Sequence, residues 1–501
     1  MLRRSFLALT FAAAFAFPAI AQERPRGPLA SELSRYMTSR TWRYATWGAL
    51  VVSLTHGDTL FSWRADEHFV PASNAKLFTT AAALHYLGDD YQFLTVLFAD
   101  GPIRGGDLYG DLVLYGTGDP TFALDTASLA PFADSVVLAG IHRIRGDIVG
   151  DASFLGAELS GPGWSPDNLD ESYAAPPSAL GAAENIIKLI VEPGRRAGQP
   201  ATYRLEPAND YYHISNLVLT SAHGRTHISV RRGESRGVVE LTGTIPVSRS
   251  AWTTSIVVQD PAVFVAGLLR QLLAARGVTV TGNTRAVTED APARAHLMLQ
   301  RSQGARDAFA GAIAVRRSET LDDLVSMINH RSHNLSAELA LRSIGRRVGN
   351  SGTFASGARA VRSYLTDKVG IPASAVQVTD GSGLSVLDAT TPRALVQLLS
   401  YERGTGGSQA FFKSLPIFGE SGRRRMTSTA AAGVLRAKTG TLTGVSALSG
   451  YVTASNGEEL AFSLIVNNSP STRRARAVQD SIGARLALYA REQAPARASG
   501  N

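Results

Sequence analysis

Three short clusters of the sequence combine serine, lysine and asparagine at spacings that suit nucleophilic catalysis. They are Ser73-Asn74-Ala75-Lys76, Ser332-His333-Asn334 and Lys438-Thr439-Gly440. A serine hydroxyl is a poor nucleophile until a base removes its proton. Because positions i and i+3 of a helix share a face, a helix over the first cluster would place Lys76 beside Ser73. The pattern therefore predicts a serine nucleophile with a lysine as its base.

Lysine is scarce in this chain. Only five of the 50 basic residues are lysines, and the others are arginines, which solvate a surface but do not act as deprotonatable bases. A buried lysine near a second cation shifts toward its neutral form, and Lys438 is the candidate for that cation. Ser73 at a helix N-terminus would also meet unpaired backbone N–H groups, which favour developing negative charge.

Each cluster also has a purely structural interpretation. Ser73 can serve only as a helix N-cap, and residues 332–334 can cap a helix that carries Glu338. Residues 438–440 can be a strand end followed by a turn, and Lys76 can be a solvated surface lysine. The order of the clusters, the shortage of lysine and the apolar stretch around Lys76 together favour catalysis.

The elements that must position these clusters lie at both ends of the chain, on either side of a long β-rich stretch. The sequence predicts a β-hairpin over 47–63, a buried helix over 76–87, helices over 321–364, 392–401 and 472–489, and strands over 444–453 and 459–466. Short strands and turns are predicted over 93–257, then a helix over 261–276 and a strand over 278–281. An economical interpretation is one domain interrupted by an insertion.

Residues 1–21 are predicted to be a secretory signal peptide, cleaved before Gln22. Arg3 and Arg4 precede an apolar run, and small residues occupy 19–21. An uncleaved anchor is the alternative, but about 15 apolar residues interrupted by Pro18 are short for a hydrocarbon core of ~30 Å. The export route, general or twin-arginine, stays open. We expect a periplasmic protein without another membrane anchor.

Composition excludes several other classes of function. Without its signal peptide the chain keeps 48 basic and 42 acidic residues, a formal charge of +6, and it has no nucleic-acid motif, so no nucleic-acid partner is expected. The absence of cysteine excludes disulfides, thiolate catalysis and cysteine-ligated metals, and no HExxH pattern marks a zinc hydrolase. We expect no metal or organic cofactor, and a disordered tail over 494–501.

Longer segments around and between the clusters resemble the D-alanyl-D-alanine carboxypeptidase/endopeptidase family. These are the class C low-molecular-mass penicillin-binding proteins of peptidase family S13, whose three motifs the clusters match. The resemblance covers nearly the whole mature chain. It is carried by PASNAKLF at 71–78, GDPT at 118–121, GPGW at 161–164, DGSGLS at 380–385 and RAKTGTL at 436–442.

The resemblance implies a mixed α+β fold with an interrupted catalytic domain. In this family a serine β-lactamase/transpeptidase-like domain contains two smaller, β-rich domains, one nested in the other. The separation of 259 positions between Ser73 and Ser332 fits that layout and is far too long for a simple β-lactamase. We expect a catalytic domain over 22–95 and 305–493, an inserted domain over 96–183 and 278–304, and a nested domain over 184–277.

The resemblance also implies an acyl-enzyme mechanism. By analogy, Ser73 attacks the carbonyl of the penultimate D-Ala of a peptidoglycan stem peptide, or the equivalent cross-link, and Lys76 is the base. Ser332, held by Asn334 and Lys438, would relay a proton to the leaving amine. Water would then hydrolyse the ester.

The strand that carries Lys438 is expected to bind the substrate. The hydroxyls of Thr439 and Thr441 with Lys438 would hold the substrate's terminal carboxylate, and Gly440 belongs to the same substrate-binding segment. The backbone N–H groups of Ser73 and Thr441 would form the oxyanion hole. β-Lactam antibiotics would acylate the same serine as substrate mimics.

Two departures from the family pattern bear on specificity. Members that bind a diaminopimelate side chain tend to carry an acid and an arginine where this chain has Asn168 and Val386. We therefore expect altered or relaxed selectivity for the third residue of the stem peptide, with Asp167 as a possible substitute acid. The middle residue of the second cluster is His333, whose titration could shift the pH optimum.

Three other functions compete with this expectation. A serine β-lactamase or esterase on the same fold would need fast deacylation, and no residue marks a dedicated deacylating base. A penicillin-binding scaffold that organises cell-wall enzymes would keep its phenotype in Ser73→Ala. A Ser-His-Asp hydrolase is disfavoured because the chain has no GxSxG elbow.

Overall fold

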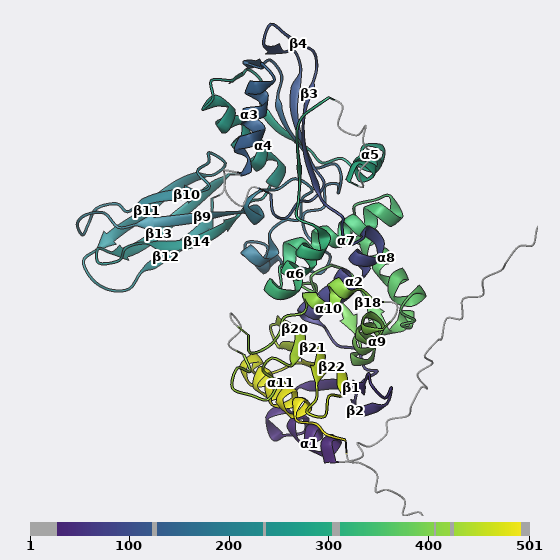
Figure 1. Ribbon diagram of the computed structural model, residues 1–501. Helices are drawn as coiled ribbons and strands as arrows, with labels where there is room; N and C mark the ends of the chain where they lie inside the picture. Colours follow the sequence, from purple (N-terminus) through teal and green to yellow (C-terminus); the bar gives the residue numbers. More distant parts are fainter. Residues whose placement is uncertain are drawn as a thin grey trace, which may run out of the picture.

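The computed structural model describes residues 28–122, 128–233, 237–302, 311–404, 407–420 and 425–491 (Figure 1). The predicted signal peptide (1–21) and tail (494–501) lie outside these residues. The fold is mixed α and β, as predicted. The molecule is elongated: a lower lobe holds both described ends of the chain, an upper lobe lies at the opposite end, and an arm projects sideways (Figure 1).

The lower lobe is built on a five-stranded antiparallel sheet in the order β2-β1-β22-β21-β20. Its strands are β1 (Thr46–Ser53), β2 (Thr59–Trp63), β20 (Leu435–Leu442), β21 (Val445–Thr453) and β22 (Glu459–Asn467). The predicted hairpin and the two predicted C-terminal strands are thereby confirmed. Pairing of β1 with β22 joins the N-terminal and C-terminal parts of the chain in one sheet. The edge strands of this sheet are β2 and β20.

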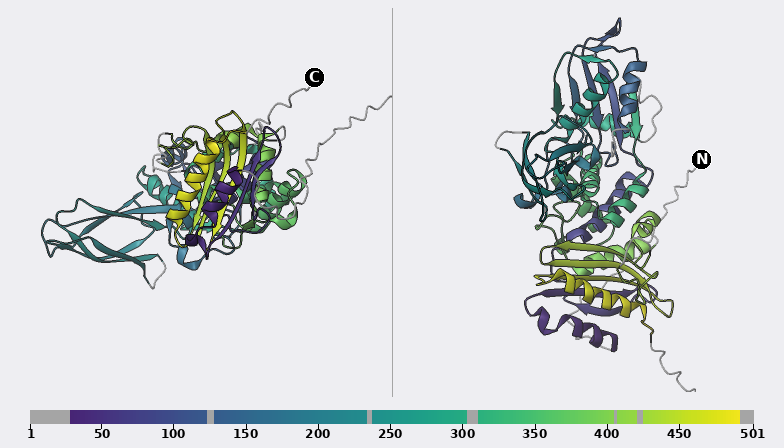
Figure 2. Two further views of the ribbon diagram at one scale, coloured as in Figure 1. Left: turned by 90° about the horizontal axis from the view of Figure 1, so that it is seen from below. Right: turned by 90° about the vertical axis from the view of Figure 1, so that its left-hand side faces the viewer.

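Both faces of this sheet are covered. Helices α1 (Pro28–Met37) and α11 (Thr472–Ala487) lie together on one face (Figure 2), where Leu33 and Ile482 pack with Val51. On the other face, α9 (Pro392–Arg403) packs against β1, β21 and β22. Because a strand's side chains alternate between faces, Leu50 and Val51 join different apolar clusters.

Helix α2 (Ala75–Leu87) lies at the centre of a helical layer above the sheet. It confirms the buried helix predicted over 76–87. Helices surround it, so its side chains are buried on nearly all sides. Its neighbours are α6 (Leu321–Arg331), α7 (Asn334–Gly349), α8 (Phe354–Asp367), α9 and α10 (Gln409–Ser414). A short strand pair, β18 (Val376–Gln377) with β19 (Ala389–Thr390), lies in the same lobe.

The upper lobe contains two further sheets and three helices. One sheet has the order β16-β8-β6-β3-β17 and the other β15-β7-β5-β4. The elements are β3 (Leu94–Asp100), β4 (Ile103–Arg104), β5 (Asp107–Leu108), β6 (Asp111–Gly116), α3 (Ala130–Leu138), β7 (Arg143–Ile144), β8 (Ile148–Asp151), α4 (Pro261–Ala274), β15 (Thr279–Val280), β16 (Thr284–Val287), α5 (Pro292–Ser302) and β17 (Ala312–Arg317). Residues 312–317, which the sequence placed in the catalytic domain, form β17 and pair with β3, most of which lies in the predicted inserted domain.

The arm consists of two three-stranded sheets, β10-β9-β14 and β11-β13-β12. Its strands are β9 (Ile186–Glu192), β10 (Thr202–Glu206), β11 (His213–Ser221), β12 (His227–Arg232), β13 (Val238–Pro246) and β14 (Trp252–Val257). It projects from the junction of the two lobes (Figure 1). The division into catalytic, inserted and nested domains is otherwise retained as a prediction.

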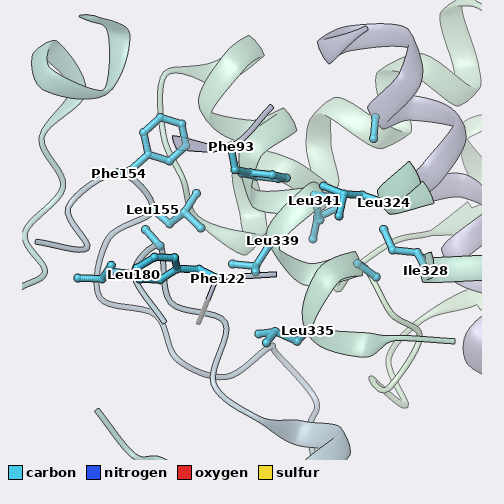
Figure 3. Close-up of a cluster of buried hydrophobic side chains, with 14 of the residues drawn as sticks. Phe93, Phe122, Phe154, Leu155, Leu180, Leu324, Ile328, Leu335, Leu339 and Leu341 are labelled. Atoms are coloured by element: carbon cyan, nitrogen blue, oxygen red, sulfur yellow. The ribbon is translucent and has the colours of Figure 1, made fainter. Parts of the chain in front are cut away.

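A buried apolar cluster joins the insertion to helices α6 and α7 (Figure 3). Phe93, just before the predicted inserted domain, and Phe122, Phe154, Leu155 and Leu180 within it pack against leucines and an isoleucine of α6 and α7. The packing fixes α6 and α7 on either side of residues 332 and 333.

The fully buried Arg342 of α7 strengthens this junction. It donates hydrogen bonds to the backbone carbonyls of Leu155, Glu158, Pro177 and Gly352. The predicted inserted domain therefore helps to hold helix α7, at whose start the second cluster lies.

Candidate active site

Ser73 and Lys76 lie side by side at the start of α2. Ser73 is in a 3₁₀ turn over Ala72–Asn74, which directly precedes the helix. The Lys76 Nζ donates a hydrogen bond to the Ser73 Oγ at 3.0 Å. Ala72 has a φ of 48°, in the left-handed region that alanine rarely adopts, so the turn that presents Ser73 is strained. The predicted proximity of Ser73 and Lys76 is thus present.

Lys76 is fully buried and holds two further partners. Its Nζ donates to Asn334 Oδ1 at 2.7 Å and to the backbone carbonyl of Ser382 at 2.6 Å. Burial disfavours the ammonium and lowers its pKa to about 8, while the negative charge of Glu338 is the strongest opposing influence. The sequence predicted this lowering but attributed it partly to Lys438. In the structure, burial is its largest cause.

Ser332 faces the second lysine. The Lys438 Nζ donates to Ser332 Oγ at 2.8 Å and to the backbone carbonyl of Thr439, the next residue along the strand, at 2.9 Å. Ser332 ends α6 with a φ of 58°, a second left-handed non-glycine residue in the site. The sequence predicted that Asn334 and Lys438 both hold Ser332. Asn334 instead contacts other residues: its Nδ2 donates to Tyr173 O at 2.8 Å and its Oδ1 accepts from Lys76. The hydrogen bond to Ser332 comes from Lys438.

The edge strand β20 passes close to the turn that carries Ser73. A Cβ added at Gly440 would lie 2.7 Å from Pro71 O and 3.1 Å from Ser73 N, so only glycine fits without displacing the turn. Asn74 Nδ2 donates to Lys438 O at 2.9 Å and fixes the same contact. Thr441, one residue farther along, is exposed to solvent. The three clusters therefore meet at one place.

Three buried acidic side chains near Lys76 were not predicted as part of the site. Glu338 is fully buried and accepts the backbone N–H groups of Gly381 at 2.6 Å and Ser382 at 2.8 Å. It therefore holds the loop whose carbonyl accepts from Lys76. Burial and the charge of Asp380 raise the pKa of Glu338 to about 8. A signal was available: Glu338 follows Asn334 by four residues, on the same helix face.

Asp380, the first residue of the DGSGLS segment, orders that loop. It accepts the backbone N–H groups of Gly383 and Ser385, each at 2.7 Å, and the Trp164 Nε1 at 2.8 Å. The last contact joins the GPGW segment to the site. Burial, followed by the charge of Asp380, raises the pKa of Asp388 well above its usual range. The described site therefore contains three buried acids around one lysine.

The positions of the two family departures lie near the same loops. Asn168 Oδ1 accepts a hydrogen bond from the Tyr173 hydroxyl at 3.0 Å. Val386 directly follows the DGSGLS loop and is 61% exposed, and Asp167 is exposed as well. Neither Asn168 nor Val386 carries a charge, so these two positions lack the acid and the arginine that the resemblance associates with diaminopimelate binding.

His333 contacts the start of the arm. Its Nε2 lies 3.5 Å from Glu184 Oε2 and its Nδ1 2.6 Å from Ser336 Oγ. The hydrogen bond with His333 is the largest cause of a lowered pKa of Glu184. Glu184 is the middle of three consecutive residues with left-handed backbone, 183–185. The sequence suggested a titrating His333 but not this partner.

The fold and the meeting of the three clusters define a penicillin-binding protein. The family model for the D-Ala-D-Ala carboxypeptidase 3 (S13) family matches residues 29–489, and the chain belongs to this family. It is a hydrolase of the D-Ala-D-Ala carboxypeptidase type, as the resemblance predicted.

Individual relatives agree with this assignment. The D-alanyl-D-alanine carboxypeptidase of Actinomadura sp. (strain R39) is 35% identical over 463 residues, which cover 89% of this chain and 82% of the relative. The D-alanyl-D-alanine carboxypeptidase DacB of Haemophilus influenzae is 25% identical over 449 residues, which cover 86% and 88%. The crystal structure of penicillin binding protein 4 (dacB) from Haemophilus influenzae shares the fold, with a TM-score of 0.78, 24% identity, and coverage of 92% of this chain and 99% of that one.

Proposed function

We propose that this protein is a serine-type D-Ala-D-Ala carboxypeptidase and endopeptidase that cleaves peptidoglycan stem peptides through an acyl-enzyme on Ser73. The observation that carries the proposal is the hydrogen bond of 3.0 Å between Lys76 Nζ and Ser73 Oγ, with Lys76 fully buried. A lysine whose pKa is lowered to about 8 is a competent base near neutral pH.

In the acylation step, Ser73 Oγ forms a bond to the carbonyl carbon of the penultimate D-Ala. The hydroxyl proton passes to Lys76, and the N–H groups of Ser73 and Thr441 bind the oxyanion. The C–N bond then breaks. The leaving amine takes the proton that Lys76 accepted, relayed through Ser332, which Lys438 holds at 2.8 Å, so Lys76 is neutral again.

In the deacylation step, water adds to the ester carbonyl and gives a proton to the same base. The C–O bond to Ser73 breaks, the proton passes from Lys76 back to Ser73 Oγ, and the shortened peptide leaves as a carboxylic acid. Substrate binding is assigned to Thr439, Gly440 and Thr441 on β20, whose edge position suits an extended peptide. These residue roles rest on the geometry of the site and on family membership.

We also propose that β-lactams acylate Ser73 and inhibit the enzyme. The Haemophilus influenzae protein has been crystallised in complex with a β-lactam, and that structure resembles this chain with a TM-score of 0.71 at 22% identity, which shows the fold alone. The support for inhibition in this chain is the site itself.

We further propose that the enzyme works in the periplasm on cell-wall peptides. The predicted signal peptide and the family's substrate support this location. Among the helices that the structure describes, none is long and apolar enough to cross a membrane.

Selectivity for the third residue of the stem peptide is expected to be altered or relaxed. Asn168 and the exposed Val386 bring no charge to the two positions at which the family pattern leads us to expect an acid and an arginine. Turnover of two stem peptides that differ only in diaminopimelate or lysine at position three would measure this. A strong preference for diaminopimelate would refute it.

The proposed activity is tested by following release of D-Ala from a stem pentapeptide and cleavage of a cross-linked dimer. The wild type should act on both, and Ser73→Ala should act on neither while remaining folded. Activity on the pentapeptide alone would remove the endopeptidase from the proposal. Rapid turnover of β-lactams without D-Ala release would favour a β-lactamase, and a Ser73→Ala variant with full cellular function would favour a scaffold.

A further inference from the structure

Arg476 reaches the substrate-binding strand from the C-terminal helix. Its Nη2 donates a hydrogen bond to Thr441 Oγ1 at 2.8 Å, and both side chains are exposed to solvent. Side chains two positions apart on a strand share a face, so Arg476 joins the face that Thr439 and Thr441 provide. No sequence motif pointed to this arginine.

Arg476 and Thr441 together offer several hydrogen-bond donors on this face of the strand. A guanidinium has five N–H donors in a planar fork that matches a carboxylate, and the contact with Thr441 uses one nitrogen. Because Thr441 Oγ1 accepts from Arg476, its own hydroxyl proton is left to donate elsewhere. An anion at this face would therefore meet donors from both residues.

The charges around Arg476 also favour an external anion. The first five residues of α11 include three arginines and no acid, although the helix dipole disfavours cations at its N-terminus. Asp480, one turn along the helix, forms its ion pair with Arg425. In the part of the chain that the structure describes, Arg476 itself forms no ion pair with a carboxylate.

Lys438 is placed for a different task. It is fully buried, and its Nζ donates to Ser332 Oγ and Thr439 O. The cation that lies against the exposed hydroxyl of Thr441 is Arg476.

We propose that Arg476 is a specificity-determining residue whose guanidinium, with the Thr441 hydroxyl, binds the free C-terminal carboxylate of the substrate. The inference rests on the proposed peptidase function and deepens it. It states that the enzyme distinguishes a free C-terminal acid from a blocked one through an arginine outside the three sequence clusters. Arg476 acts on substrate choice and takes no part in proton transfer at Ser73.

The test compares two peptides that both end in D-Ala-D-Ala, one as the free acid and one as the C-terminal amide. We would measure kcat/KM for the wild type, Arg476→Gln, Arg476→Lys and the matched control Arg473→Gln, which removes an exposed charge from the same helix. A charge-assisted hydrogen bond contributes roughly 1.5 kcal/mol or more, so Arg476→Gln should lose about tenfold or more on the acid. Its activity on the amide should change less than about threefold, and Arg476→Lys should be intermediate.

Several outcomes would overturn the proposal. They are an equal loss on acid and amide, an unchanged preference for the acid in Arg476→Gln, and an Arg473→Gln variant that loses as much as Arg476→Gln. Melting temperatures of all variants show whether a loss reflects folding, and Arg476→Lys tests the proposal even if the glutamine variant is unstable. If the wild type releases no D-Ala from the acid, the proposed function itself fails, which is a different result from an active enzyme that ignores Arg476.

Discussion

Replacing Glu338 by glutamine should move the pH dependence of acylation toward lower pH. Burial lowers the pKa of Lys76, and the negative charge of Glu338 is the strongest of the charges that raise it. The substitution keeps the size of the side chain and removes its charge. The neutral form of Lys76, which accepts the proton of Ser73, is then populated at lower pH.

The size of the effect follows from the distance between the charges. Lys76 Nζ and Glu338 are connected through Ser382, with hydrogen bonds of 2.6 Å and 2.8 Å to its carbonyl and N–H. At about 6 Å and an effective dielectric constant of about 20, a full charge contributes about 3 kcal/mol, or about two pH units. Burial raises the pKa of Glu338 to about 8, so it carries only part of its charge near neutral pH. We therefore expect the acid limb to move down by about one pH unit.

The substitution should also destabilise the fold. Glu338 accepts two backbone N–H groups, whereas a glutamine has one acceptor oxygen and an NH₂ that cannot accept. One buried N–H loses its partner, which costs about 1–3 kcal/mol of unfolding free energy. The stability loss and the pH shift are separate results.

The assay is the second-order rate of acylation by a chromogenic or fluorescent β-lactam from pH 5 to 10. Because Lys76 works as the neutral base, the wild-type rate should rise with pH through about 8. The matched control is Glu402→Gln, another buried glutamate, which accepts from the Tyr364 hydroxyl and the Ser408 N–H. It should lose stability without moving the acid limb. An acid limb of Glu338→Gln that stays in place or moves upward would refute the reasoning.

Three further predictions concern other parts of the site. Gly440→Ala should slow acylation at least about tenfold because the new Cβ lies 3.1 Å from Ser73 N, and an unchanged acylation rate would contradict the close approach. Arg342→Met should lower the unfolding free energy by about 3 kcal/mol or more in denaturant titrations, because it leaves buried carbonyls without donors, and a loss below about 1 kcal/mol would count against the junction. His333→Ala should lower the unfolding free energy by roughly 0.5–1.5 kcal/mol in denaturant titrations, because it removes the contacts with Glu184 Oε2 and Ser336 Oγ, and an unchanged stability would count against these contacts.

The sequence was sufficient for elements whose pattern is local. Helix α2 follows from a stretch rich in alanine, leucine and threonine, and the C-terminal strands follow from two apolar-rich stretches joined by a turn at 455–457. The pairing of Ser73 with Lys76 could be predicted because a helix fixes the direction of positions i and i+3.

Features that depend on distant parts of the chain could not be predicted. Glu338 finds its N–H donors more than forty residues downstream, and Arg476 finds Thr441 only because α11 packs across the sheet. Strand β17 pairs with β3 across more than two hundred residues of sequence, and no local pattern predicts that pairing. The left-handed backbone of Ser332 likewise arises from the packing of α6 and α7.

The central claim is that Ser73 is the acylated nucleophile, and a mass measurement tests it most directly. Residues 22–501 would be purified and incubated with a fluorescent penicillin, and the labelled peptide would be identified over time. We predict one stable adduct per chain, on Ser73, absent from Ser73→Ala. Rapid release of the label would favour a β-lactamase. An adduct elsewhere, or none from folded protein, would contradict the claim.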